Sequence, residues 1–96
     1  MSEVQAGKYK MQRGEHLLSA YRDAEGREYI ITRDIHHYLG ITYYIASHMI
    51  PRWENEEKLH RISVVGSKAR YVNVKELDLL RKEIHQPIPE PSKRED

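Results

Sequence analysis

Cysteine and phenylalanine are both absent from this chain of 96 residues. Without cysteine, neither a disulfide nor a thiolate zinc site can hold the fold together. No apolar run approaches the roughly 20 residues that would cross a bilayer. The first residues, MSEVQAGKYKMQR, lack the apolar centre of a signal peptide. We therefore expect one small domain that is soluble, cytoplasmic and not bound to a membrane.

An excess of one charge is absent as well, because 16 Lys and Arg residues are balanced by 15 Asp and Glu residues. The distribution, however, is uneven. Residues 4–14 and 59–75 carry cations and no acid, whereas acids gather at 54–57 and in the last predicted helix. Such a distribution is compatible with nucleic-acid binding, for which the location of charge matters more than its sum. Seven tyrosines supply rings that can pack on one side and bond polar partners through the hydroxyl.

The first third of the chain is predicted to contain an arm, a helix and a short strand. Residues 1–13 show no clear periodicity and are interpreted as a flexible N-terminal arm. Residues 14–24 are predicted to be helical, because Leu17, Leu18 and Tyr21 share one face at helical spacing. Gly26 ends that helix, and the β-favouring Tyr29–Ile31 is predicted to be a strand.

Two helices joined by a tight turn are predicted next. Thr32 is expected to cap a short helix, which Gly40 ends in a left-handed conformation. Thr42 is the expected cap of a third helix, whose buried face contains Ala46, Met49, Ile50 and Trp53. Pro51 leaves two alternatives open: the helix kinks at Ile50, or a new turn begins with Pro51 in its first position.

A β-hairpin and a last helix complete the prediction. Apolar residues alternate with polar ones over 61–64 and 71–74, on either side of the turn residues Gly66 and Ser67. Residues 74–84 have the apolar spacing of an amphipathic helix. Residues 86–96 contain three prolines and a charged end, so we expect a disordered tail.

The outer face of the third predicted helix carries Tyr43, Tyr44, Ser47 and His48, and no acid. A face that only needs water would more often carry Glu and Lys. Hydroxyl and aromatic side chains on an exposed helix can reach base edges in the major groove of DNA. Tyr44 lies near the edge of this face, where partial packing against the preceding helix is equally compatible with the pattern.

Three segments, TRDIHHYLGIT, YYIASHMIPRWENEEKL and HRISVVGSKARYVNV, together resemble a winged helix-turn-helix domain of the MarR and PadR regulator type. The resemblance implies an α+β, mostly α fold over 14–85, with a three-helix core, a two-stranded wing and a C-terminal helix. Lys58 departs from the pattern, because it replaces the usual glycine before the exit leucine. Pro51 is atypical too.

This resemblance implies double-stranded DNA as the partner, with the third helix in the major groove and the wing on the minor groove or backbone. Arg33 and Arg52 would lie near phosphates, Arg52 less securely because it starts from the buried edge of its helix. The predicted DNA-binding residues are Arg33, Thr42, Tyr43, Tyr44, Ser47, His48, Arg52, Ser67, Lys68 and Arg70.

Enzymatic and metal-dependent functions receive no support from the sequence. It contains no nucleophile elbow, phosphate loop or cofactor fingerprint, so we expect a non-enzyme without a cofactor. The histidines show no metal-binding spacing, and the neighbours His36 and His37 are expected to point apart on a helix.

Three functions remain open. The first is a homodimeric transcriptional regulator that reads a palindromic site. The second is a plasmid or chromosome segregation protein that spreads along DNA and works with a partner ATPase. The third is a module that binds other proteins; it ranks last because it would need neither an acid-free helix face nor a basic hairpin.

Overall fold

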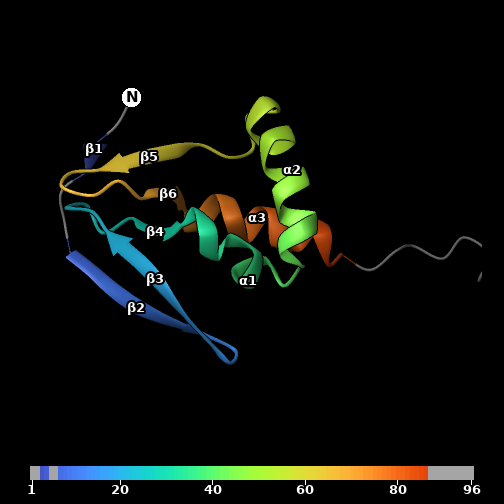
Figure 1. Cartoon of the computed structure of the whole chain (residues 1–96), viewed down its shortest axis with the longest axis horizontal. Coiled ribbons are helices and arrows are strands. Elements are labelled where there is room, and N and C mark those ends of the chain that lie inside the picture. The colour runs from blue at the N-terminus through green and yellow to red at the C-terminus, as the bar shows by residue number, and fades with distance from the viewer. Residues whose placement is uncertain (1–2, 5–6, 87–96) are drawn as a thin grey trace, which may run out of the picture.

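The structure is a computed structural model, and it describes residues 3–4 and 7–86 (Figure 1). The strands are β1 (Glu3–Val4), β2 (Gly7–Arg13), β3 (His16–Arg22), β4 (Glu28–Ile31), β5 (Arg61–Val64) and β6 (Arg70–Asn73). The helices are α1 (Ile35–Leu39), α2 (Tyr43–Asn55) and α3 (Val74–Ile84), with a 3-10 turn at Thr32–Asp34. The strands form one sheet in the order β1-β5-β6-β4-β3-β2. Only β1 pairs in parallel, and the other neighbours are antiparallel.

The predicted fold class is therefore wrong. The chain is an α+β protein built on a large antiparallel sheet, and not a mostly α winged helix-turn-helix domain with a three-helix core. The difference arises at residues 7–22, which were expected to be an arm followed by a helix. They form the hairpin β2–β3, so the predicted first helix does not exist. The predicted flexible arm at 1–13 is wrong for residues 7–13 and for Glu3–Val4, which pairs with β5, while residues 1–2 and 5–6 lie outside the described residues.

A period of two explains why residues 7–22 form strands. Tyr9 and Met11 point inward from β2, opposite Ala20 and Leu18 of β3 in the antiparallel register. Gly14 adopts a positive φ of 58° in the two-residue turn between the strands, where a side chain would be strained. These apolar pairs pack one face of the hairpin against the core. A helix over the same residues could not direct all four side chains to one face.

The remaining elements agree with the sequence more closely. The strand at 29–31, the hairpin of β5 and β6, and the helix at 74–84 are confirmed. Gly40 is left-handed at φ 73°, and the Thr42 hydroxyl accepts the Ile45 N–H at 3.1 Å, as predicted. The predicted cap at Thr32 is wrong, because the 3-10 turn and α1 both lack a side-chain cap.

Helix α2 continues through Pro51 to Asn55, so no new helix begins at the proline, and the alternative of a kink at Ile50 stays a prediction. Of the predicted tail, only Gln86 belongs to the described residues, and 87–96 lie outside them. Within the described ranges, every helix is too short or too polar to cross a membrane.

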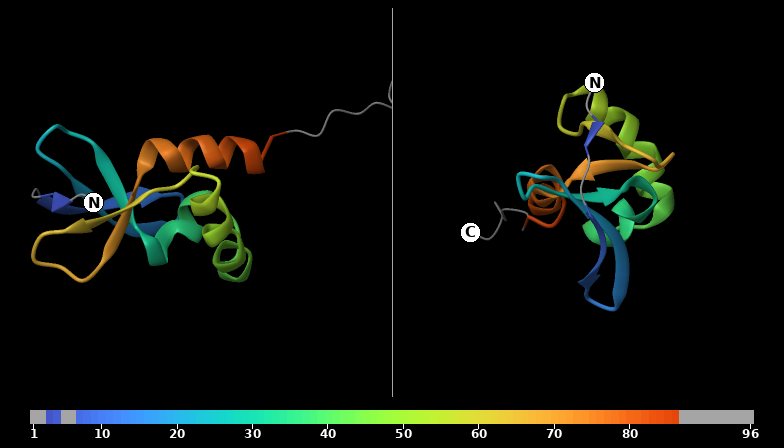
Figure 2. Two further views of the ribbon diagram at one scale, coloured as in Figure 1. Left: turned by 90° about the horizontal axis from the view of Figure 1, so that it is seen from above. Right: turned by 90° about the vertical axis from the view of Figure 1, so that its left-hand side faces the viewer.

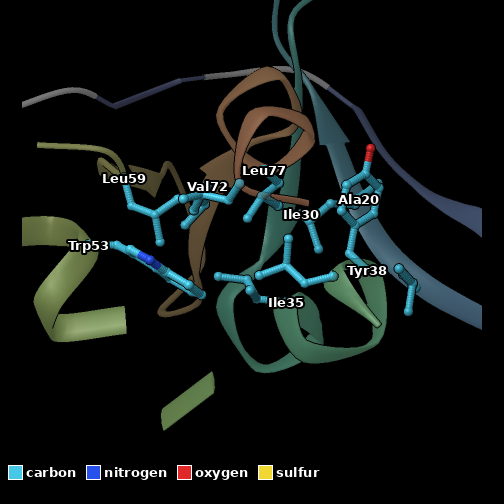
Figure 3. Close-up of a cluster of buried hydrophobic side chains, with 11 residues drawn as sticks. Ala20, Ile30, Ile35, Tyr38, Trp53, Leu59, Val72 and Leu77 are labelled. Atoms are coloured by element: carbon cyan, nitrogen blue, oxygen red, sulfur yellow. The ribbon is translucent and has the colours of Figure 1, made fainter. Parts of the chain in front are cut away.

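Two apolar clusters occupy opposite faces of the sheet. The larger one joins strand residues such as Ile30 and Val72 to α1, α2 and α3 (Figure 3). Trp53 of α2 and Leu77 of α3 belong to it and are almost completely buried, which confirms the prediction of a core position for Trp53. The smaller cluster contains no helical residue; its buried members are Tyr21, Tyr29, Ile31, Val64 and Tyr71.

The helices gather at one end of the molecule, and the strands extend beyond them at the other (Figures 1 and 2). In Figure 1, α2 and α3 lie toward the right, while the turn between β5 and β6 reaches the left-hand end. Figure 2 shows the strong twist of the sheet, which splays the hairpin β2–β3 away from the hairpin β5–β6.

Candidate nucleic-acid interface

The outer face of α2 presents its aromatic residues to solvent. Tyr43 and Tyr44 are 66% and 71% exposed, so Tyr44 does not pack against the preceding helix. Ser47 is exposed as well, and its hydroxyl donates to the Tyr44 carbonyl at 2.9 Å. Because that bond uses only the hydroxyl proton, the Ser47 oxygen can still accept a hydrogen bond. Thr42, in contrast, already uses its oxygen as the helix cap.

Two ring contacts hold the exposed aromatic side chains in place. The ring of His48 meets Tyr44 edge-on, with centroids 4.4 Å apart, and His36 meets Tyr43 in the same way at 5.7 Å. Edge-to-face contacts of this kind are favourable for aromatic pairs. They restrict the rings before any partner arrives, which lowers the conformational entropy lost on binding.

A shallow hollow brings Arg33 next to α2. The hollow lies between the 3-10 turn and the helix, and Arg33, Tyr43 and Ser47 all line it. The Arg33 side chain is 74% exposed, and its Nε is 4.0 Å from the nearest Asp34 oxygen, which is a weak ion pair. Three of the predicted site residues therefore lie together, with a guanidinium largely available to an anion.

The part of α2 nearer its C-terminal end is different in charge. His48 and Arg52 line a separate hollow together with Glu54. Arg52 is 3.7 Å from Glu56, one turn further along the chain. Glu54 is bound by Arg61, whose hydrogen bonds hold the pKa of this carboxyl below its ordinary value. His48 and Arg52 are thus separated from the Arg33 group and lie beside acids.

The tip of the hairpin β5–β6 carries the remaining predicted residues. Lys68 and Arg70 are exposed, and the Ser67 hydroxyl accepts the Ala69 N–H at 3.0 Å. The tip lies at the far end of the molecule from α2 (Figure 1), so the structure does not bring Lys68 next to Tyr43. Ser67 does share a hollow with Arg33, on the side of the sheet away from the helical core.

The histidines depart from the sequence prediction in one respect. The rings of His36 and His37 do not point apart: their centroids are 3.9 Å apart, and His16 stacks on His37 at 4.0 Å. Burial and the two neighbouring histidines lower the pKa of His37. Within the described ranges, no group of three or more His, Asp or Glu side chains is arranged to hold a metal ion.

Two cations of the Arg33 and Ser67 hollow were not among the predicted site residues. Lys8 and Lys10 line it from β2, a segment that was predicted to be a flexible arm. The signal was present as the alternation Lys8, Tyr9, Lys10, Met11, which places both lysines on one face of a strand. The absence of acid from residues 4–14 was a second signal.

Comparisons with known proteins identify no relative: no family model, curated protein or solved structure matches this chain. The resemblance to MarR and PadR regulators therefore stays a prediction.

Proposed function

We propose that this protein binds double-stranded DNA and acts as a small homodimeric transcriptional regulator. The exposed face of α2 lies in the major groove, where Tyr43, Tyr44 and Ser47 contact base edges. The major groove, about 12 Å wide, admits a helix, and its base edges present a distinct pattern for each base pair. Arg33, beside this face, contacts a phosphate and fixes the orientation of the helix.

The observation that carries this proposal is the acid-free, aromatic face of α2 with Arg33 beside it. The only acid within α2 is Glu54, which lies near the end of the helix and is paired with Arg61. Exposed tyrosines are enriched at contact surfaces, because the ring can pack against a partner while the hydroxyl bonds a polar group. The major groove of DNA offers polar base edges between negatively charged phosphates. It can therefore bind both the tyrosine hydroxyls and the Arg33 guanidinium.

The dimer is part of the proposal because of the small size of α2. One recognition helix reads only a few base pairs, so useful specificity needs two helices, about one helical turn of DNA apart. The expected site is therefore a palindrome. Analytical ultracentrifugation of the protein on such a duplex should give two chains per site, and a single chain at a single half-site would contradict the dimer.

The test begins with selection of a bound sequence from a random duplex pool, followed by affinity measurements on that duplex and a scrambled one. Tyr43→Ala and Ser47→Ala should each weaken specific binding by about 1–3 kcal/mol for every base that the side chain contacts. Binding to the scrambled duplex should hardly change, because phosphate contacts remain. Leu79→Ala is the matched control, since Leu79 of α3 is 67% exposed and lies outside both hollows that contain Arg33.

Three results would count against the proposal. The absence of any duplex binding by the unmodified protein at low salt would remove DNA as the partner. Equal weakening on both duplexes would make the face of α2 a phosphate-binding surface and not a sequence reader. Many copies bound along a long duplex without a preferred site would favour a segregation protein that spreads on DNA.

A further inference from the structure

A second basic hollow lies on the side of the sheet away from the helical core. Lys8 and Lys10 of β2, Arg33 of the 3-10 turn, Ser67 of the hairpin tip and Tyr71 of β6 line it. These residues come from three segments that are far apart in the sequence, residues 8–10, Arg33 and residues 67–71, so only the folded sheet assembles the group. The floor is formed by apolar parts of β3, β4 and the hairpin turn.

The lysines of this hollow differ from two arginines at and after the end of β3. Arg22 is 2.7 Å from Glu28, and Arg27 is 2.8 Å from Asp23 and 2.6 Å from Glu25. Within the described ranges, neither Lys8 nor Lys10 is paired with a carboxylate. The side chain of Lys10 donates only to the Ser19 hydroxyl, at 3.1 Å. The positive charge of the hollow is thus not neutralised within the protein.

The neighbouring acids do not cancel this charge. Asp23, which shares another hollow with Lys8, is bound by Arg27 at 2.8 Å. Asp34 is mostly buried, and its Oδ2 accepts the Ser19 N–H at 2.8 Å, so the carboxylate is directed into the fold. Its other oxygen is 4.0 Å from Arg33, which makes a weak pair. The residues that line the hollow thus include three exposed cations and no carboxylate, so the hollow favours an anion.

Arg33 lines both hollows. It lines the hollow of α2 together with Tyr43 and Ser47, and it also lines the hollow of the sheet together with Lys8 and Lys10. We propose that the hollow of the sheet binds the sugar-phosphate backbone of the DNA beside the segment read by α2. This inference rests on the proposed function and extends it to a second contact surface.

The size and chemistry of the hollow fit an extended backbone better than a single ion. The hollow encloses about 520 Å³ and is open to solvent, so it does not close around one phosphate group. Lysine and arginine supply the charge, and the Ser67 hydroxyl adds a polar group of the kind that bonds phosphate oxygens. Successive phosphates can then contact Arg33 and the lysines in turn.

The experiment compares two double variants that remove the same charge. Lys8→Ala with Lys10→Ala removes the lysines of the hollow, and Arg81→Ala with Lys82→Ala removes two exposed cations of α3. Affinity for the selected duplex is measured over a range of salt concentrations. The first variant should lower the slope of log K against log salt by about one to two units, since each phosphate contact contributes close to one. The α3 variant should keep the slope of the unmodified protein.

Shortening the duplex locates the contact. When base pairs are removed from the flank, the difference between the unmodified protein and the Lys8→Ala, Lys10→Ala variant should disappear while α2 still recognises its site. Lys8→Gln with Lys10→Gln keeps polar side chains on β2 and should give the same lower slope, which excludes an effect of misfolding. Thermal melts of each variant provide the folding control.

The outcomes separate this inference from the proposed function. If the unmodified protein binds DNA and both double variants keep its slope, the hollow is not a phosphate site, while DNA binding by α2 stands. If both double variants lower the slope equally, the effect is one of net charge and the inference fails. If the unmodified protein does not bind any duplex, the proposed function and this inference are both overturned.

Discussion

The two faces of the sheet differ in what covers them and in which residues they bury. On one face, Ile30 and Val72 are covered by three helices and belong to an apolar core. On the other face, the buried members of the smaller cluster all lie in strands, and three of them are tyrosines. The rings of Tyr21 and Tyr71 lie 5.6 Å apart there, in a tilted contact.

Charge adds to this difference. On the first face, beyond the helices, Arg22 pairs with Glu28 beside Tyr9. On the second face, the Arg33 hollow is rimmed by lysines that have no carboxylate partner among the described residues. A paired cation contributes to the folded state, whereas an unpaired one costs little while it stays hydrated and is available to an anion. Exposed charge on this sheet therefore indicates a binding surface only where the protein leaves it unpaired.

The largest expected effect is at the covered face. Trp53→Ala removes a large side chain that is 4% exposed, so the free energy of unfolding should fall by about 3–5 kcal/mol. Denaturant unfolding followed by circular dichroism measures this decrease. By contrast, Lys10→Ala on the second face should change stability by no more than about 0.5 kcal/mol, as is usual for surface positions. Similar decreases for both variants would remove the distinction between the faces.

A smaller effect tests how far the binding surface extends. Lys68→Ala with Arg70→Ala removes two cations at the tip of the hairpin β5–β6. If the tip contacts phosphates, the slope of log K against log salt should fall by about one to two units for every sequence. The comparison uses the same duplexes as the hollow variants. An unchanged slope in a folded double variant would limit the interface to α2 and the hollow.

The smallest expected effect concerns a paired charge at the helical end. The Glu76 carboxylate accepts the His60 backbone N–H at 2.9 Å and lies 2.7 Å from Nδ1 of its ring. The hydrogen bond and the negative charge of Glu76 raise the pKa of His60 above its ordinary value of 6.5. The stabilisation is therefore fully present below about pH 6.5 and is lost as the pH rises through the higher pKa of the folded state.

The measurement is an NMR titration of the His60 ring in the unmodified protein and in Glu76→Gln. The midpoint should lie above 6.5 in the former and move down in the latter. Thermal stability should fall slightly between pH 6 and pH 8 only while Glu76 is present. Identical midpoints in the two proteins would show that the pair does not influence the histidine in solution.

Local patterns predicted the second half of the fold. Each pattern there fits one type of secondary structure: the alternation in β5 and β6 fits strands, the glycine fits a turn, and the apolar spacing of α3 fits a helix. The predicted bounds of α3 accordingly agree with the structure. The candidate site could be predicted in part, because α2 has a buried stripe and a remaining exposed face. The prediction failed at β3, where Leu17, Leu18 and Tyr21 fit a helical face and a strand equally well.

Local sequence was sufficient to specify the short elements, the cap at Thr42, the left-handed stop at Gly40 and the acid-free face of α2. The hairpin at residues 7–22 depends instead on the tertiary structure, because its strands are stabilised by neighbours distant in the chain. The tertiary structure also decides which cations have a carboxylate partner. Lys8, Arg33 and Ser67 are separated by tens of residues, and the antiparallel sheet brings them around one hollow. Pairing between distant strands carries no local signature, since its free energy depends on contacts that form only in the complete sheet.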